Sequence, residues 1–448
     1  MKSNILKMFR FVITGMFLSG ALFGSQAWAG DYLNQYLPDY LKADVEFRYR
    51  LEYRDNMLFN KAKDDAGSYD LFRTRVGLTY NPIKEVTLFA QGQDARVSGL
   101  STQDKSEVAK STLENLWDIR QLYGRYEQGP ITIQGGRQEF AYGAERLIGA
   151  FNWSNVAQTF DGGKVGFHIQ PLNLQLDLLA GDKTGYRSPQ SDEANDLFDA
   201  SAKDRMYAYY ATAHAFHGTL IENYLIHRVT WKNISFGPNG SGRIDDYTFG
   251  GRLKNKLPYH FDYEMESAGQ WGDFDHKRVC AAMFVGILGY TLDLKWQPRL
   301  AFEYDYGSGG KPNGKTLGTF DNLYPTNHLF YGYMDLFSLQ NINDYRYQVS
   351  IKPAKNLKLQ TDFHMVYLDT TKDALYSAAR TVTRTTPAGL LGVSSHVGNE
   401  LDLTGDYKLN KYLSFQAGYC HLFPGEYLKD TGPHNGADFA FFQTTLAF

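Results

Sequence analysis

The chain has 448 residues, of which 15% are aromatic, and it carries a formal net charge of −3. The chain is not basic overall, so its charge does not indicate nucleic-acid binding. Only Cys280 and Cys420 occur and there is no C-x-x-C-H motif, which excludes a disulfide framework and covalently attached haem.

The N-terminal region is typical of a secretory signal peptide. Basic residues flank an apolar run over 11–24, and Ala27-Trp28-Ala29 follows with the small-x-small pattern of a cleavage site. The run is shorter than the roughly 20 residues of a membrane helix. We therefore expect 1–29 to be a signal peptide. We expect 30–448 to be one domain, because no linker or change of composition divides it.

Period-two alternation is the main structural signal after the signal peptide. In 44–54 the apolar face has Val45, Phe47, Tyr49, Leu51 and Tyr53, and the charged face has Glu46, Arg48, Arg50, Glu52 and Arg54. The same pattern recurs in 171–178, 345–352 and 357–365. Each of these segments is predicted to be a strand with one apolar face and one wet face.

Applied along the chain, the pattern predicts about eighteen strands. They are expected at 43–54, 70–80, 84–96, 117–128, 130–140, 159–169, 172–181, 205–216, 219–231, 244–254, 259–270, 277–293, 297–307, 343–353, 357–369, 396–407, 412–424 and 437–448. Tight links such as 81–84 and 353–356 alternate with long connections such as 308–342 and 370–395.

This rhythm predicts an all-β, transmembrane, antiparallel β-barrel with short periplasmic turns and long extracellular loops in a Gram-negative outer membrane. The terminal Phe448 closes the last predicted strand, as a barrel-insertion signal would. A soluble periplasmic β-protein is the alternative, because a β-sandwich also alternates.

One segment carries a family resemblance. Residues 136–156 read GRQEFAYGAERLIGAFNWSNV and continue to Thr-Phe-Asp-Gly at 159–162, and two earlier strands read FRTRVGL at 72–78 and WDIRQLY at 117–123. These segments resemble the alginate export family. The positions singled out in the characteristic block are Glu139, Gly143, Glu145, Trp153, Asn155 and Asp161.

The resemblance implies a monomeric eighteen-stranded barrel whose arginine-rich constriction passes a uronic-acid polymer. Arg73, Arg75, Arg137 and Arg146 match motif positions, and alternation adds Arg48, Arg50 and Arg125 as pore-lining candidates. A planar guanidinium pairs bidentately with carboxylates and keeps its charge. The alternative is that these arginines pair with Glu46, Glu52, Glu139 and Glu145 and stiffen the wall.

We therefore predict a passive outer-membrane channel for anionic solutes, and the solute that the resemblance favours is a polyuronate such as alginate. Its partners would be the anionic solute, outer-membrane lipid and a periplasmic or inner-membrane export assembly. A general diffusion porin for small solutes or sugars is the alternative, because predicted lumen positions are also acidic. These are Asp177, Asp262, Glu264, Glu266, Asp293, Glu303 and Asp305.

Other motifs are weaker. Residues 309–316 fit the phosphate-loop pattern without the flanking strand and helix that it requires. The acidic run 192–199 lacks EF-hand spacing, so a solvated loop is favoured over a calcium site. An outer-membrane hydrolase would need a serine beside a histidine such as His364 or His421, and a structural barrel would need no wide lumen. No catalytic residue, metal or cofactor is predicted. Two isolated cysteines in apolar strands are favoured over a single bridge, which an oxidising compartment would allow.

Overall fold

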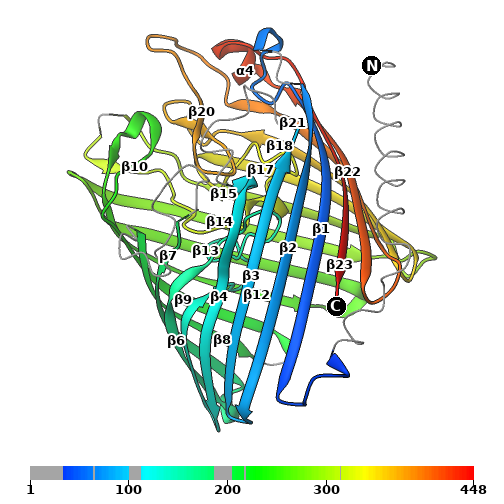
Figure 1. Cartoon of the computed structure of the whole chain (residues 1–448). Coiled ribbons are helices and arrows are strands. Elements are labelled where there is room, and N and C mark those ends of the chain that lie inside the picture. The colour runs from blue at the N-terminus through cyan, green and yellow to red at the C-terminus, as the bar shows by residue number, and fades with distance from the viewer. Residues whose placement is uncertain (1–33, 64–65, 100–111, 186–203, 216–217, 313) are drawn as a thin grey trace.

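The segments of alternating apolar and polar residues form one large antiparallel sheet in the computed structural model of the protein (Figure 1). The structure describes residues 34–63, 66–99, 112–185, 204–215, 218–312 and 314–448, so the predicted signal peptide lies outside it. The wall strands are β1 (Leu41–Asp55), β2 (Gly67–Ile83), β3 (Val86–Ser98), β4 (Asn115–Gln128), β5 (Ile131–Gln138), β6 (Phe160–Ile169), β7 (Leu174–Lys183), β8 (Asp204–His214), β9 (Leu220–Thr230), β12 (Ile244–Lys256), β13 (Phe261–Phe274), β14 (Lys277–Thr291), β15 (Arg299–Gly307), β17 (Ile342–Ala354), β18 (Leu357–Tyr367), β21 (His396–Lys408), β22 (Leu413–Pro424) and β23 (Ala437–Ala447).

The small elements lie in connections. They are η1 (Lys61–Lys63), η2 (Gln170–Leu172), β10 (Ile234–Ser235), η4 (Gly237–Asn239), β11 (Ser241–Gly242), η5 (Pro258–His260), β16 (Thr316–Leu317), η6 (Asn327–Leu329), β19 (Ala374–Tyr376), β20 (Val382–Thr385) and α4 (Glu426–Thr431). The two-residue β16 pairs in parallel with the start of β14, which brings the sheet to 19 strands. The other eighteen form the barrel.

The barrel closes because its first and last strands pair. β1 and β23 are antiparallel from Glu46↔Ala447 to Asp55↔Asp438, and Figure 1 shows the blue strand beside the dark red one. The backbones of Val45 and Phe448 exchange two further hydrogen bonds, of 2.7 and 3.0 Å. Closure leaves no open strand edge, which is the condition for a sheet to span a bilayer.

The connections differ between the two rims. Short turns such as 84–85 and 355–356 lie at one rim, which we call the short-turn rim. Long connections, including 139–159, 308–341 and 368–395, start from the other. The link between β13 and β14 departs from the predicted rhythm, since only residues 275–276 join them on the long-loop side. The short-turn rim is the periplasmic one in outer-membrane barrels.

The two faces of the wall are inverted relative to a soluble protein. On β17 the outward Tyr345, Tyr347 and Val349 are 36%, 51% and 44% exposed, whereas the inward Asp344 and Arg346 are buried. A belt of exposed apolar side chains is what a membrane-spanning barrel presents to lipid. No helix of the described segments is long and apolar enough to cross a membrane.

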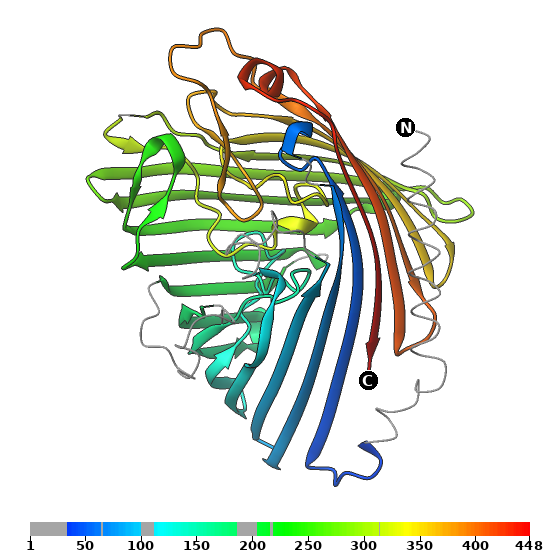
Figure 2. The same cartoon turned by 45° about the horizontal axis from the view of Figure 1, so that its top comes forward.

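Two connections fold into the lumen instead of standing above it. They are the first inward loop, residues 139–159, and the second inward loop, residues 308–341, and Figure 2 shows chain inside the ring of strands. Ile148 and Tyr324 form a parallel bridge between them, and both are buried. Together with inward residues of the wall they build a hydrophobic core inside the barrel.

The cysteines lie on opposite faces of the wall in the structure. Cys280 on β14 is exposed and Cys420 on β22 is buried, and both are unpaired. The structure shows no bridge between them.

Candidate functional site

The first inward loop is fastened to the N-terminal wall by buried arginines. Arg48 donates to the carbonyl oxygens of Asn152 (2.8 Å) and Ser154 (3.0 Å). Arg73 donates to the same two oxygens at 2.9 and 3.1 Å, and also to Glu46 at 2.7 Å. Both arginines are 3% exposed. Their guanidinium groups are therefore occupied by the loop backbone.

Two further arginines hold the tip of that loop. Arg50 donates to the Trp153 carbonyl at 2.7 Å, and its guanidinium carbon lies 3.9 Å from the centre of the Trp153 ring. Arg75 donates to the side chains of Asn152 (3.0 Å) and Gln93 (2.7 Å). The alternating arginines of β1 and β2 thus converge on four consecutive loop residues, 152–155, with Asn155 accepting from Arg48 at 3.2 Å.

Asn155, Glu145 and Gly143 of the family block shape the first inward loop. Asn155 donates to the carbonyl oxygens of Phe72, Arg96 and Leu113, at 2.8 to 3.2 Å. Glu145 accepts from the Ala150 amide (3.0 Å) and from the Thr326 hydroxyl (2.8 Å). Gly143 has φ +62°, and a Cβ there would lie 2.5 Å from the Tyr210 hydroxyl, so this close approach requires glycine.

The three other motif residues brace the wall and the loop. Glu139 accepts from Arg120, an inward arginine that alternation on 117–123 could have identified. Asp161 on β6 binds Arg137 on β5 bidentately at 2.7 and 2.9 Å. The Trp153 ring stacks on His328 of the second inward loop, with ring centres 3.8 Å apart. The characteristic block is therefore the loop that fills the lumen, together with the strands that support it.

The second inward loop is fastened to the C-terminal wall. The Tyr333 amide donates to Asp402 (3.1 Å) and the Met334 amide to Glu400 (3.0 Å). The intervening backbone turns at Gly332, with φ +91°, where a Cβ would lie 2.4 Å from a Glu400 oxygen. Arg228 on β9 binds Asp204 and Asp321, which fastens the loop to the wall at Asp321.

Arg146 joins the two inward loops to the wall. It binds Glu303 at 2.5 Å and lies 3.6 Å from Asp305 on β15, and its guanidinium carbon is 3.8 Å from the centre of the Phe330 ring. Burial by itself would lower the pKa of Arg146, but Asp305 and Glu303 raise it well above its ordinary value. The side chain is therefore permanently cationic.

A cavity of about 490 Å³ lies between these loops and the wall of β12, β13, β14, β15, β17, β18 and β21. Among the described residues that line it, six are cationic and three are acidic. The cations are Arg146, Arg252, Lys254, Arg299, Arg346 and Lys358, and the acids are Glu264, Glu303 and Asp406. Further carboxylates, including Asp262 and Asp362, pair with these cations but do not line the cavity.

Of the seven arginines predicted from the sequence, Arg146 lines this cavity. Arg48, Arg50, Arg73 and Arg75 lie under the first inward loop, Arg137 binds Asp161, and Arg125 pairs with Glu127 toward the short-turn rim. The other cavity cations were not singled out. Their signal was present, because Arg252, Arg299, Arg346 and Lys358 occupy polar positions of alternating strands.

The predicted acidic lumen positions are placed correctly with one exception. Asp177, Glu264, Glu266, Glu303 and Asp305 are buried inside the barrel, and Asp262 pairs with the inward Arg299. Asp293 is exposed in the turn after β14. The prediction for Asp293 was wrong, because the strand ends at Thr291 and the alternation of faces does not continue into a turn.

The weaker motifs gain no support from the geometry. The amides of Gly309 and Gly310 donate to Asp369 (2.9 Å) and Asp373 (2.6 Å), so carboxylates occupy the place where a phosphate would bind. The acidic run 192–199 lies outside the described residues. His364 binds Asp344 at 2.6 Å and has Asp402 at 3.9 Å. Within the described ranges no three His, Cys, Asp or Glu side chains are grouped to hold a metal ion.

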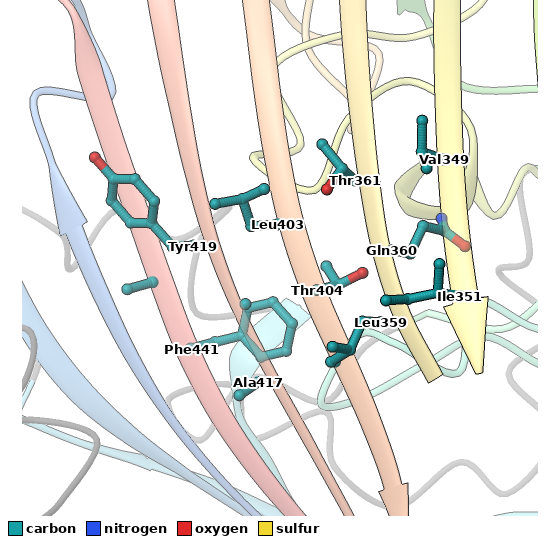
Figure 3. Close-up of a pocket in the computed structure, with 13 residues that line it drawn as sticks. Val349, Ile351, Leu359, Gln360, Thr361, Leu403, Thr404, Ala417, Tyr419 and Phe441 are labelled. Carbon is teal, nitrogen blue, oxygen red and sulfur yellow. The ribbon is translucent and has the colours of Figure 1, made fainter. Parts of the chain in front are cut away.

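A second hollow lies on the outside of the wall. Figure 3 shows its lining, which includes Val349, Ile351, Leu359 and Leu403. These residues alternate with the inward Gln348, Lys358 and Gln360 and therefore face away from the lumen. An apolar hollow on this face borders the lipid and does not form part of a solute path.

A sequence profile described as alginate export matches residues 39–442. The chain belongs to the alginate export family. A comparison with curated proteins found no match.

This family member is similar in fold to solved outer-membrane porins of Pseudomonas aeruginosa. OpdL aligns with a TM-score of 0.60 and 13% identity over 92% of this chain and 99% of its own. OccK5 (OpdH) aligns with a TM-score of 0.59 and 9% identity over 91% and 98%. OccK2 (OpdF), solved in complex with glucuronate, aligns with a TM-score of 0.56 and 11% identity over 91% and 98%. Family and fold together establish an outer-membrane channel.

Proposed function

We propose that this alginate export family member conducts anions, and that its solute is a uronic acid or a polyuronate such as alginate. The observation that carries the proposal is the lining of the lumen cavity, where cationic tips outnumber carboxylates six to three. Guanidinium and ammonium groups attract carboxylates without fixing one tight pose, which a conducting path requires. The printed ligand of the neighbour OccK2, glucuronate, is a single uronic acid.

The two inward loops supply selectivity and gating in this proposal. They occupy the lumen between the cavity and the long-loop rim, and they are held by hydrogen bonds to the wall that a passing solute could exchange. The protein has no catalytic role. If the solute is a polymer, the driving force comes from an export assembly in the periplasm or inner membrane.

Reversal potential in planar bilayers under a salt gradient tests the proposal directly. We expect anion preference, and we expect current block when oligomannuronate is added to one side. The double variant Lys254→Gln/Arg299→Gln should weaken both effects, because these side chains are 54% and 26% exposed to the lumen. The matched control is Lys295→Gln, an exposed lysine of the turn after β14 outside the cavity. Cation preference without block would favour the general diffusion porin.

A further inference from the structure

The lumen cavity is not charged on all sides. Its wall carries the cationic tips of Lys254, Arg299 and Lys358, whereas the second inward loop contributes Leu329, Phe330 and Tyr333. Leu329 is 49% exposed although it lies inside the barrel. An exposed leucine in a polar lumen forgoes the free energy of burial, so a ligand that covers it gains binding free energy.

This apolar ledge, defined as Leu329, Phe330 and Tyr333, is held in a fixed position. The Leu329 carbonyl accepts from Arg346 at 3.3 Å, and the Phe330 ring lies against Arg146. The Tyr333 backbone is bound to Asp402, and its ring packs edge-on against Trp153 with centres 6.1 Å apart. The ledge is therefore preorganised, and a ligand does not have to order it.

We propose that the ledge and the cationic wall together form a binding site for carboxylates that carry an apolar group, such as arylalkanoates. The carboxylate would compete with Asp262 for Arg299 and with Glu264 for Lys254, while the apolar group covers Leu329 and Phe330. This inference rests on the proposed anion path and adds to it a second class of solute, less polar than the uronic acids. A cavity of about 490 Å³ lies within the ~300–1,000 Å³ typical of small-molecule sites.

The charge of the ledge supports the same chemistry. Burial, together with Asp406 and Asp362, raises the pKa of the Tyr333 hydroxyl well above its ordinary value. A tyrosine is neutral at pH 7 at its ordinary pKa, and the raised pKa keeps Tyr333 neutral at alkaline pH as well, so it adds no negative charge to repel a carboxylate. The cationic and apolar halves of the site remain distinct under ordinary conditions.

Titration calorimetry on the detergent-solubilised protein measures binding independently of conduction. The probes are acetate, phenylacetate, glucuronate and 2-phenylethanol. We expect phenylacetate to bind about tenfold or more tightly than acetate, because burial of the ring adds to the same carboxylate contact. 2-Phenylethanol, which lacks the carboxylate, should bind more weakly than phenylacetate. Equal affinities for acetate and phenylacetate, or tighter binding of glucuronate than phenylacetate, would overturn the proposal.

Substitutions of Leu329 test whether the ledge causes the preference for phenylacetate over acetate. Leu329→Asn should reduce the advantage of phenylacetate over acetate to about twofold or less, while Leu329→Met should retain it. Leu391→Asn is the control, since Leu391 is 89% exposed in the connection between β18 and β21. A preference that survives Leu329→Asn would also overturn the proposal. Cation-selective current with intact phenylacetate binding would reject the proposed conduction alone, whereas anion-selective current without the preference would reject the ledge alone.

Discussion

The N-terminal and C-terminal walls of the barrel use the same residue types in different ways. On β1 and β2, Arg48 and Arg73 are 3% exposed because the first inward loop covers them and supplies carbonyl oxygens. On β12 and β15, Lys254 and Arg299 are paired with Glu264 and Asp262, but their side chains line the cavity and are 54% and 26% exposed. An inward cation becomes a structural clamp or an available site according to what folds over it.

Substitution of Arg146 should have the largest effect on stability, because this arginine is buried and faces several carboxylates. Arg146→Met leaves Asp305 buried without this cation and leaves Glu303 with Arg346 alone, and we expect a loss of about 3–5 kcal/mol in the free energy of unfolding. Urea unfolding followed by heat-modifiable gel mobility measures it. Arg205→Met, at a pair whose arginine is 39% exposed, should cost less than about 1 kcal/mol. Equal losses in the two variants would contradict the clamp.

Removal of the clamp from the N-terminal wall should free the first inward loop. Arg48→Ala/Arg73→Ala leaves the carbonyl oxygens of Asn152 and Ser154 without these donors, and we expect a loss of about 2–4 kcal/mol. Single-channel conductance should rise and become noisier, because the loop then samples positions away from the lumen. Arg96→Ala, at an exposed pair on β3, is the control. A stable variant with unchanged conductance would show that the loop does not depend on these arginines.

Trp153 tests whether the two inward loops act as one unit. Trp153→Leu removes the stack on His328 and the contact with Arg50, and we expect a cost of about 1–2 kcal/mol. Trp153→Phe should retain part of it. The midpoint of thermal unfolding, read from gel mobility, orders the three proteins. Identical midpoints would mean that the loops are stabilised independently.

The smallest effect on stability should come from the open wall. Arg299→Gln breaks a pair with Asp262 whose partners are 26% and 30% exposed, so we expect a loss of less than about 1 kcal/mol. The reversal potential should nevertheless move toward cation preference. A large loss of stability without a change in reversal potential would place Arg299 with the clamped arginines and remove the contrast between the walls.

Most of the barrel could be predicted from local pattern. The strand expected at 343–353 is Ile342–Ala354, and the strand expected at 396–407 is His396–Lys408. Alternation succeeds here because each strand has one lipid face and one lumen face along its whole length. It failed at Asp293, where the strand had already ended, and it made the outer link between β13 and β14 too long, 271–276 instead of 275–276.

The roles within the lumen required the tertiary structure. The sequence by itself determined the strands, their two faces, the rims and the family, because these depend on neighbouring residues and a recognisable block. The structure alone decided that 139–159 and 308–341 fold inward, that Arg48 and Arg73 meet Asn152, and that Lys254 and Arg299 stay open. Those outcomes depend on contacts between residues about 80 to 180 positions apart, such as Arg73 with Asn152 and Glu145 with Thr326, and no local period records such contacts.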